Sequence, residues 1–322
     1  MGVTENREKG PQIVKRIRVL SLALALTLTA AGCGSAPPDA SAEPAAPTWT
    51  EDTRVSYLGP AGTYTEEATQ FFFHGTGTLL PKGTVEEAIA DVTGGTADYA
   101  VIPQENTLGG AVTNYVDALM GAEGVYVVGE VILPISQTLL GVPGATLADI
   151  QTVCSHAQGI KQSEQWRGEH LPDAATEEMP STAAAASYVA ERGDKTIAAI
   201  AAPAAAELYG LSVLAENVQI TDANKTRFYV LSSAPLAVGG NRRAVFVASC
   251  EASRIDDIIV TIHDAGLELV TIHDRPDGRA LGSYRYLIET ETGDGVTQKQ
   301  IDKVRAHGEI RFLGSYGVVE KE

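Results

Sequence analysis

The chain has 322 residues, of which 44% are hydrophobic and 20% charged, a composition typical of a globular protein with two or three domains. Its formal net charge of −17 argues against nucleic acid and against anionic lipid surfaces as partners. An anionic substrate would therefore need a local positive site, such as a helix N-terminus or one or two basic side chains.

The N-terminal segment has the pattern of an export signal. Basic residues at 15–18 precede an apolar run at 19–31, which is too short to span a bilayer but fits the apolar region of a secretory signal. The small residues before Cys33 resemble the end of a bacterial lipoprotein signal, in which this cysteine carries the lipid. We predict a signal peptide at 1–33 and a flexible linker at 34–52. The protein would then be lipid-anchored on the outer face of the cell membrane, or cytoplasmic if the signal is not used.

Strands and helices alternate through residues 53–234. Residues 53–59 read as a strand, and a helix follows at 65–73 with Thr63 or Thr65 as its N-cap. The alternation continues through a helix at 85–93 and a buried strand at 99–103, then through 125–134, 135–142, 147–150, 152–155, 159–168, 181–192, 196–200 and 204–209. This pattern predicts an α/β fold with largely parallel sheets, whose ligands bind where strands end and helices begin.

The pattern changes after a predicted linker at 235–241. Strands are expected at 244–250, 267–273, 283–290 and 309–316, and helices at 253–265 and 297–307. Their β-α-β-β-α-β order predicts a ferredoxin-like module at 242–319.

Two further cysteines, Cys154 and Cys250, lie in apolar runs of different predicted domains. We predict two buried thiols, although an exported protein would also permit a disulfide. The sequence has no Cys/His spacing typical of a metal site, so no metal is expected.

Six short motifs carry the functional signal. They are Gly-Pro-Ala-Gly-Thr-Tyr-Thr-Glu-Glu-Ala at 59–68, Pro-Gln-Glu-Asn-Thr at 103–107 followed by Gly-Gly-Ala-Val at 109–112, Ser-His-Ala-Gln at 155–158 with Gln162, Ser-Thr-Ala at 181–183, Glu-Leu-Tyr-Gly-Leu at 207–211, and Asn-Lys-Thr-Arg-Phe at 224–228. In this order they resemble the prephenate dehydratase family, whose hallmark is the Thr-Arg-Phe signature. The resemblance implies a two-lobed, periplasmic-binding-protein-like catalytic domain at 53–234. It also implies a lyase that converts prephenate to phenylpyruvate in L-phenylalanine biosynthesis.

The chemistry of this reaction indicates what the site must contain. Prephenate has two carboxylates and a ring hydroxyl, and it loses one carboxylate as CO2 and the hydroxyl as water. Aromatisation drives the reaction, so we expect no cofactor. The protein must hold one carboxylate, place the other in a poorly solvated pocket and assist the departing hydroxide. Thr226 is the catalytic candidate, as in the family, and it would act through a directed hydrogen bond because threonine is a very weak acid.

Seven residues are candidates for substrate binding, and several have structural alternatives. They are Asn106, Thr107, Ser155, Gln162, Thr182, Arg227 and Phe228. Arg227 could fork onto a substrate carboxylate, or pair with an acidic neighbour and brace the cleft. Asn106 follows a buried strand, where its amide could bind the substrate or serve as a turn residue. Ser155 and Thr182 each start a predicted helix, where capping and anion binding can coexist.

Other polar residues of the motifs are harder to assign. Gln162 lies one turn into a predicted helix and could reach the cleft, and Phe228 would be both wall and core. His156 could act as an acid–base group or only shape its loop. Glu105 is expected to be structural, since a carboxylate facing a dianion would repel it.

Residues 242–319 resemble the ACT domain, a regulatory module that binds phenylalanine at subunit interfaces in this family. Of the two motifs that mark that site, only Arg275 and Pro276 remain as possible effector contacts. Arg254 stands where a small glycine is usual and could fill the pocket, so phenylalanine feedback is doubtful. The open sheet edges of such a module predict a homodimer or a higher homo-oligomer.

Three other functions stay open. A prephenate decarboxylase would lose CO2 without aromatising, and the intact Thr-Arg-Phe signature argues against it. Arogenate, the amino analogue, is an alternative substrate. A catalytically inactive solute-binding or sensing lipoprotein could use the same two-lobed cleft, which the export signal favours and the complete motif set disfavours. Turnover that depends on Thr226 would separate an enzyme from a binding protein.

Overall fold

The computed structural model describes residues 49–322, all of which belong to one compact unit. The predicted signal peptide, Cys33 and most of the predicted linker lie outside the described residues. None of the helices in the described part combines the length and the apolar character needed to span a bilayer.

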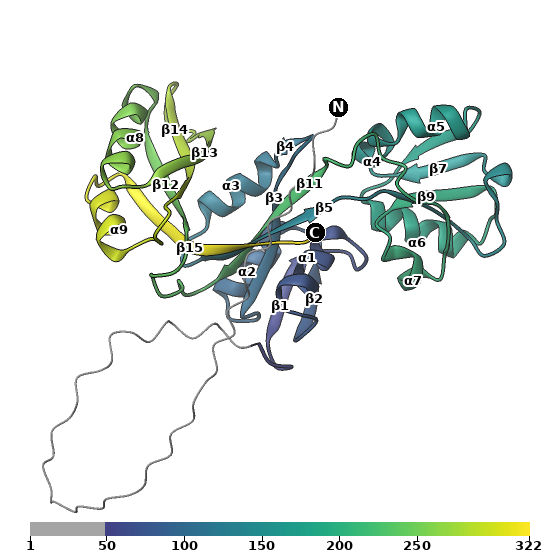
Figure 1. Cartoon of the computed structure of the whole chain (residues 1–322), viewed down its shortest axis with the longest axis horizontal. Helices are drawn as coiled ribbons and strands as arrows, with labels where there is room; N and C mark the ends of the chain where they lie inside the picture. Colours follow the sequence, from purple (N-terminus) through teal and green to yellow (C-terminus); the bar gives the residue numbers. More distant parts are fainter. Residues whose placement is uncertain (1–48) are drawn as a thin grey trace, which may run out of the picture. The chain divides into compact units, whose positions relative to one another are not determined.

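The first lobe is built on five neighbouring strands in the order β5-β11-β3-β1-β2. They are β1 (Arg54–Leu58), β2 (Thr78–Lys82), β3 (Tyr99–Asn106), β5 (Tyr126–Pro134) and β11 (Lys225–Ser232), and the short β4 (Gly110–Ala111) pairs with β3. Helix α1 (Tyr64–Phe72) packs on one face, and α2 (Val85–Thr93) and α3 (Thr113–Gly121) pack on the other (Figure 1). Side chains of β11 alternate accordingly, because successive strand residues point to opposite faces. Phe228 and Val230 meet α1, whereas Tyr229 and Leu231 lie on the side of α2 and α3.

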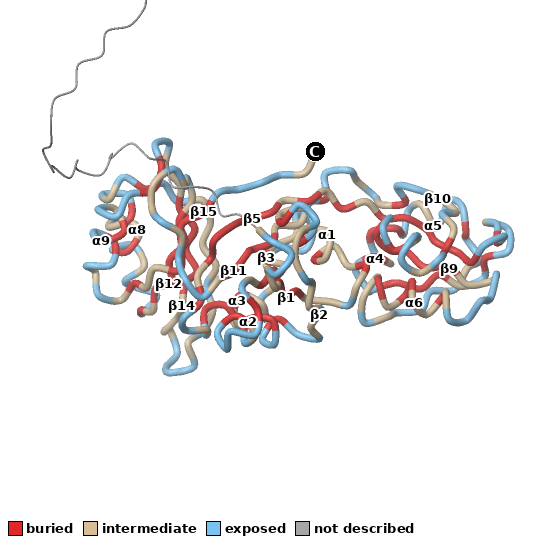
Figure 2. Tube along the Cα trace, turned by 90° about the horizontal axis from the view of Figure 1, so that it is seen from below, coloured by how far each residue is buried: buried red, intermediate tan, exposed pale blue. Residues whose placement is uncertain are grey.

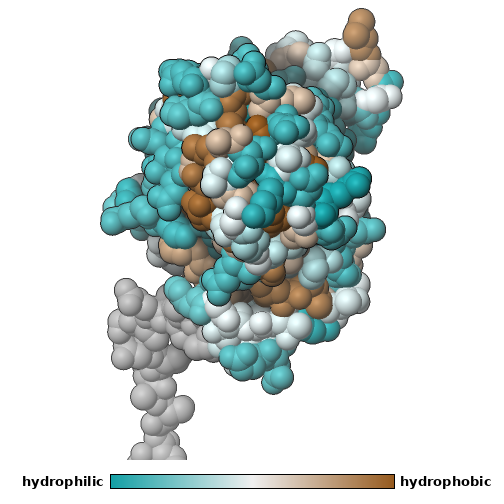
Figure 3. All heavy atoms as spheres, turned by 90° about the vertical axis from the view of Figure 1, so that its right-hand side faces the viewer, coloured by the Kyte–Doolittle hydropathy of each residue, from teal (hydrophilic) through white to brown (hydrophobic). Residues whose placement is uncertain are grey.

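The second lobe is inserted between β5 and β11. Its five-stranded sheet has the order β10-β6-β9-β7-β8. The elements are β6 (Thr138–Gly141), η1 (Leu147–Asp149), β7 (Thr152–Ser155), α4 (Ala157–Gln162), α5 (Glu164–His170), β8 (Ala175–Glu178), α6 (Thr182–Arg192), β9 (Ile197–Ala201), α7 (Ala205–Tyr209) and β10 (Ser212–Ala215). Small side chains form much of its core, including Ala185, Ala186, Ala199 and Ala201. Figure 3 faces the end of the molecule formed by the second lobe, and the surface there mixes hydrophilic and hydrophobic residues.

The C-terminal module has the predicted β-α-β-β-α-β order. It comprises β12 (Arg243–Glu251), η2 (Ala252–Arg254), α8 (Ile255–Asp264), β13 (Glu268–Pro276), β14 (Ser283–Glu291), α9 (Gln298–Arg305) and β15 (Ile310–Glu320). Helices α8 and α9 cover one face of its antiparallel sheet, and the other face packs against the first lobe through Val245, Leu287 and Leu313. Buried residues concentrate on the strands of both lobes and of the module (Figure 2).

The module and the first lobe share a continuous sheet through β15. Its first part pairs with β12, and its last residues, 317–320, pair in parallel with β5. Gly314 lies where the two partners diverge, with φ of 150°, and a Cβ there would come within 2.0 Å of the Val127 carbonyl oxygen. Only glycine fits this crossing, because any side chain would collide with fixed backbone.

Several predicted elements are confirmed. Helix α2 has the expected bounds, Thr63 caps α1, and Cys154 and Cys250 are free buried thiols. The prediction of largely parallel sheets is wrong, because β11 runs antiparallel to both β3 and β5, and β6 to both its neighbours. The chain leaves the first lobe at Pro134, the end of β5, and re-enters it opposite that residue at Lys225, so β11 must run antiparallel to β5.

Two helix starts are each one residue away from their predicted positions. His156, not Ser155, is the N-cap of α4, and its Nδ1 accepts from the Gln158 backbone N–H. Ser181, not Thr182, is the N-cap of α6 and accepts from the Ala184 backbone N–H. Ser155 remains in strand β7, because its hydroxyl is turned inward to the neighbouring strand rather than toward the helix.

Candidate active site

A cavity of about 310 Å3 lies between the two lobes, beside the segments that connect them. The first lobe contributes Thr63, Tyr64 and Asn106, and the second lobe contributes Gln158, Gln162 and Thr182. The connecting segments add Gln137 and Asn224, and the start of β11 adds Thr226. No Lys, Arg, Asp or Glu from the described residues is among those that line it. Uncharged amides and hydroxyls therefore supply nearly all of its polar groups.

Thr226 takes part in a chain of neutral hydrogen bonds. Asn106 Nδ2 donates to Thr226 Oγ1 at 2.9 Å and to Asn224 Oδ1 at 2.8 Å. Asn224 Nδ2 in turn donates to Gln162 Oε1 at 3.2 Å. The Thr226 hydroxyl thus accepts from Asn106, and it donates to no acceptor within residues 49–322. Its proton is free for an oxygen atom in the cavity.

Asn106 is both a turn residue and a cleft residue. Its Oδ1 accepts from the backbone N–H groups of Leu108 at 3.0 Å and Gly109 at 3.1 Å, which closes the turn after β3. Gln158 Nε2, from the second lobe, donates to the same oxygen at 3.0 Å. These three donors fix the orientation of the amide, so its Nδ2 must point to Thr226 and Asn224.

Two helices begin at this cavity. Thr63 and Ser181, the N-caps of α1 and α6, both line it, so the N-terminal N–H groups of these helices lie at its edge. Such groups attract a carboxylate without a charged side chain. Tyr64 forms part of the wall. Burial raises the pKa of its phenol, so Tyr64 stays neutral and donates to the Ser136 carbonyl at 2.5 Å.

The structure brings four of the eight catalytic and substrate-binding candidates into the cavity lining: Thr226, Asn106, Gln162 and Thr182. The other four lie elsewhere. Thr107 exchanges hydrogen bonds with the Lys225 backbone, buried Ser155 donates to the Ile200 carbonyl at 2.7 Å, and Phe228 packs in the core under α1.

Arg227 occupies the face of β11 opposite Thr226. It pairs with Glu105 at 2.9 Å, with Glu130 at 3.0 Å, and with Glu289 of the C-terminal module. Adjacent residues of a strand point to opposite faces, so Thr226 and Arg227 cannot both face the cleft. The sequence left two alternatives for Arg227, and the structure shows the second, in which the residue pairs with acidic neighbours. This corrects the prediction that Arg227 binds substrate.

The cavity also contains residues that were not singled out as site candidates, among them Asn224, Gln137 and Gln158. His156, considered above as an acid–base group, lines it as the cap of α4. Asn224 and Gln158 belong to motifs quoted above, so their presence in the site could have been predicted. Gln137 is outside every motif, and no sequence signal marks it.

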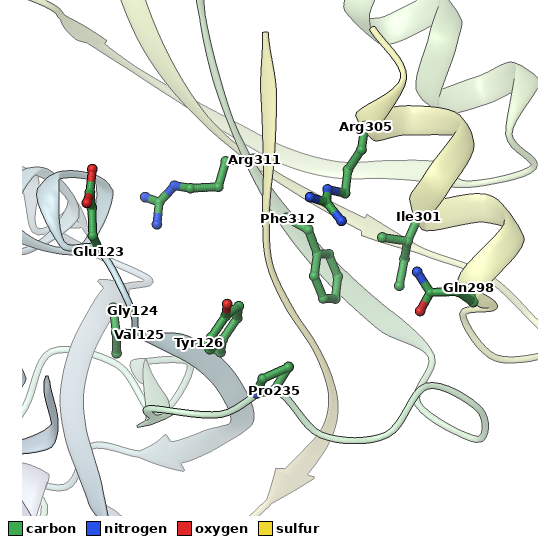
Figure 4. Close-up of a pocket in the computed structure, with 10 residues that line it drawn as sticks. All are labelled: Glu123, Gly124, Val125, Tyr126, Pro235, Gln298, Ile301, Arg305, Arg311 and Phe312. Carbon is green, nitrogen blue, oxygen red and sulfur yellow. The ribbon is translucent and has the colours of Figure 1, made fainter. Parts of the chain in front are cut away.

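A second cavity, of about 460 Å3, lies where the start of β5 meets α9 and β15 (Figure 4). Arg305, Arg311, Phe312 and Tyr126 are among its lining residues. It contains none of the motif residues, so its larger size does not make it the active site. The possible effector contact Arg275 lies outside both cavities and pairs with Asp117 of α3 at 2.7 Å.

The comparisons with known proteins agree with the fold and the motifs. Residues 55–235 match the family model for prephenate dehydratase. The chain is 35% identical to the prephenate dehydratase of Corynebacterium glutamicum, over 74% of this chain and 78% of that one. It is 32% identical to that of Amycolatopsis methanolica, over 82% of this chain and 88% of that one.

Two solved structures share this architecture. The prephenate dehydratase of Arthrobacter aurescens, solved in complex with L-Phe, is similar with a TM-score of 0.75 and 32% identity over 82% of this chain and 90% of that one. A protein described as a novel type of quorum quenching acylase, GqqA, is similar with a TM-score of 0.73 and 27% identity over 83% of this chain and 98% of that one. The two lobes and their cleft define a periplasmic-binding-protein-like catalytic domain. The chain belongs to the prephenate dehydratase family.

Proposed function

We propose that this protein converts prephenate to phenylpyruvate, with release of CO2 and water, as a step of L-phenylalanine biosynthesis. It is a lyase of the prephenate dehydratase type. The observation that carries the proposal is the Thr226 hydroxyl, which accepts from Asn106 and keeps its own proton for the cavity. A directed donor at this point is what the departing hydroxide requires.

The reaction follows from the arrangement of neutral groups. One carboxylate of prephenate binds at the helix starts capped by Thr63 and Ser181. The other loses CO2, and its electron pair enters the ring as the C–O bond on the opposite carbon breaks. Thr226 donates a hydrogen bond to the leaving oxygen, and the departing hydroxide takes up a proton from solvent to become water. Asn106 Nδ2 holds the Thr226 oxygen in place during this step.

Among residues 49–322, no Lys, Arg, Asp or Glu lines the cavity, and this favours decarboxylation. A carboxylate that leaves as CO2 loses its charge, so a strong ion pair would stabilise the starting state more than the transition state. A site of amides, hydroxyls and helix N-termini orients the dianion without this cost. His156 also lines the cavity, and its Nδ1 is engaged as the cap of α4.

The deciding experiment follows phenylpyruvate by its ultraviolet absorbance in alkali, after purified full-length protein is mixed with prephenate at neutral pH. We expect rapid product formation, about 100- to 1000-fold lower kcat in Thr226→Ala, and partial activity in Thr226→Ser, which keeps the hydroxyl. Arogenate is assayed in parallel to identify the preferred substrate. If folded wild-type protein binds prephenate and forms no product, a solute-binding function replaces this proposal.

A second activity, hydrolysis of an acyl amide, is suggested by the similarity to the quorum quenching acylase. Ser181 and His156 both line the cavity, but Ser181 Oγ caps α6 and His156 Nδ1 caps α4. Neither group is arranged as a nucleophile with its base, which disfavours this activity. Incubation with an N-acylated amine and detection of the free amine tests it directly.

We also infer export, lipid anchoring at Cys33 and self-association. The N-terminal sequence pattern supports the first two, and the open edge of the βαββαβ module at β13 supports the third. Such a module is what an ACT domain would form, and a relative has been solved with L-Phe. Arg275 and Arg254 are already paired with Asp117 and Glu309, which supports weak or absent phenylalanine control. Lipid labelling of wild type and Cys33→Ser, light scattering, and phenylalanine titration test these points.

A further inference from the structure

A buried carboxylate of the C-terminal module reaches into the first lobe. Glu289 of β14 is fully buried, and its oxygens accept from Tyr229 OH at 2.5 Å, from Gln104 Nε2 at 3.1 Å and from Arg227. Tyr229 and Arg227 belong to β11, and Gln104 belongs to β3. Glu289 therefore ties together the two strands that carry Thr226 and Asn106.

We propose that Glu289 is a positioning residue for the dehydratase reaction: it fixes β11 and β3 from behind, so that Thr226 and Asn106 meet in the cleft. The C-terminal module thereby completes the active site of the first lobe. This inference rests on the proposed function for its kinetic test, and it also has a structural readout that does not depend on turnover.

The register of the two strands supports this role. Thr226 pairs with Asn106 and Arg227 with Glu105, but Phe228 pairs with Pro103, so Gln104 is an extra residue in β3. A bulge of this kind changes the direction of nearby side chains. Gln104 and Glu105 both turn toward the module, and Asn106 next to them turns to the cleft. Glu289 thus holds the bulge on the module side of the sheet. On the cleft side, the bulge orients Asn106 toward Thr226.

Arg227 strengthens the same connection. Its guanidinium is held by Glu105, Glu130 and Glu289 at once, and only 17% of its side chain is exposed. Burial raises the pKa of Glu289, whereas Arg227 and the Tyr229 hydroxyl favour its ionised form. A glutamine at position 289 would keep an acceptor for Tyr229, and Arg227 would keep two carboxylate partners. Loss of the Glu289 charge should therefore loosen the two strands without unfolding them.

The reaction is sensitive to such a change, because the hydrogen bond from Asn106 to Thr226 spans the two strands. A shift of about 1 Å in a catalytic group can lower a rate by up to about 100-fold. A smaller relaxation of β11 against β3 should lower kcat while the helix starts still bind substrate, so KM should change little.

The chain offers a matched control. The ion pair between Arg275 and Asp117 also joins the module to the first lobe, at 2.7 Å, but it connects β13 to α3 and contacts neither β3 nor β11. Asp117→Asn removes one charge from this contact, as Glu289→Gln does from the other. Any general effect of a weakened module contact appears in both variants.

The experiment compares kcat and KM for prephenate in full-length wild type, Glu289→Gln, Glu289→Asp and Asp117→Asn, at a temperature well below the unfolding midpoint of each. We expect Glu289→Gln to lower kcat about tenfold with KM within about twofold of wild type. Glu289→Asp should recover part of this loss, because it restores the charge. Asp117→Asn should leave both constants unchanged. An active wild type with an unchanged kcat in Glu289→Gln overturns the inference.

Hydrogen exchange separates this inference from the proposed function. We expect Glu289→Gln to speed exchange of the amides in β3 and β11, and Asp117→Asn to leave them as in wild type. If wild type shows no dehydratase turnover, the proposed function fails and the exchange pattern alone decides whether Glu289 fixes the two strands. Equal exchange in both variants overturns the inference.

Discussion

The two junctions of the first lobe are built from different chemistry. The cleft toward the second lobe is lined by amides and hydroxyls such as Asn106, Gln162 and Thr226, with no Lys, Arg, Asp or Glu from the described residues. The junction with the C-terminal module holds Arg227 among three carboxylates. The two lie back to back on β3 and β11, separated by one layer of backbone.

This contrast shows how an acidic protein can bind a dianion. The three carboxylates of the module junction share the Arg227 guanidinium, so this cation braces the scaffold and does not compete for the substrate. The cleft keeps polar groups that attract a carboxylate but impose little electrostatic cost when it leaves as CO2. The net charge of −17 is therefore compatible with an anionic substrate, because no acidic side chain lines the cavity within residues 49–322.

The largest expected effect comes from removing the cation of the module junction. Arg227→Met leaves Glu130 and Glu289 buried without their common partner. Breaking a buried ion pair on one side destabilises a protein by about 3–5 kcal/mol. Urea unfolding followed by circular dichroism should show a loss of this size. Arg54→Met, at an exposed pair with Asp98, is the control and should cost far less stability than Arg227→Met. Similar losses in both variants would contradict the importance of the buried junction.

The second prediction places a charge in the neutral cleft. Asn106→Asp keeps the size of the side chain but sets a carboxylate beside Thr226 and removes the donor to its oxygen. We expect kcat/KM for prephenate to fall about 100-fold or more, through repulsion of the dianion and loss of the hydrogen bond. Gln165→Glu, at an exposed position of α5 that does not line the cavity, adds the same charge and should have no effect. Retention of wild-type kcat/KM in Asn106→Asp would show that neutrality of the cleft is unimportant.

The two junctions also differ in how far the sequence predicts them. Thr226, Asn106 and Gln162 lie in motifs, and the structure places them together as that pattern indicates. The opposite direction of Arg227 also follows from strand periodicity, which puts neighbours on opposite faces. Glu289 could not be predicted, because it lies 62 residues after Arg227 and outside every motif. The same holds for the bulge at Gln104, which depends on pairing with a distant strand.

In the second lobe, the local sequence could not predict which residue caps helix α4. Ser155 and His156 are adjacent and both suit a helix start, so the N-cap rule alone could not choose between them. The choice depends on the Ile200 carbonyl, which accepts from the Ser155 hydroxyl and comes from another strand. The sequence therefore placed α1, α2 and α6 to within a residue, but it predicted one helix at 159–168 where the structure has α4 and α5, and it missed α3.

The third prediction concerns Gly159, which lines the cavity and lies against Ser155. A Cβ at Gly159 would lie 2.4 Å from Ser155 Oγ, which is buried and bonded to β9. Gly159→Ala should displace α4 and with it Gln162, at a cost of about 1–3 kcal/mol in stability. We expect kcat/KM to fall about tenfold as well. Gly168→Ala, in α5, has no neighbour within contact distance of its Cβ and serves as the control. A variant Gly159→Ala as stable as wild type would show that Ser155 can move.

The smallest effect concerns Cys154, a buried thiol outside both junctions, whose acidic neighbour should make it unreactive. Cys154 lies in β7 beside Glu177, and burial together with this carboxylate raises the pKa of the thiol to about 11. A raised pKa disfavours the thiolate, so roughly one thiol in a thousand is ionised at pH 8. In a Cys33→Ser background, iodoacetamide should label Cys154 far more slowly than a free thiol at pH 8, and urea should restore the labelling. Labelling of the folded protein at the rate of a free thiol would mean that Cys154 is accessible and ionised, and would contradict the raised pKa of this thiol.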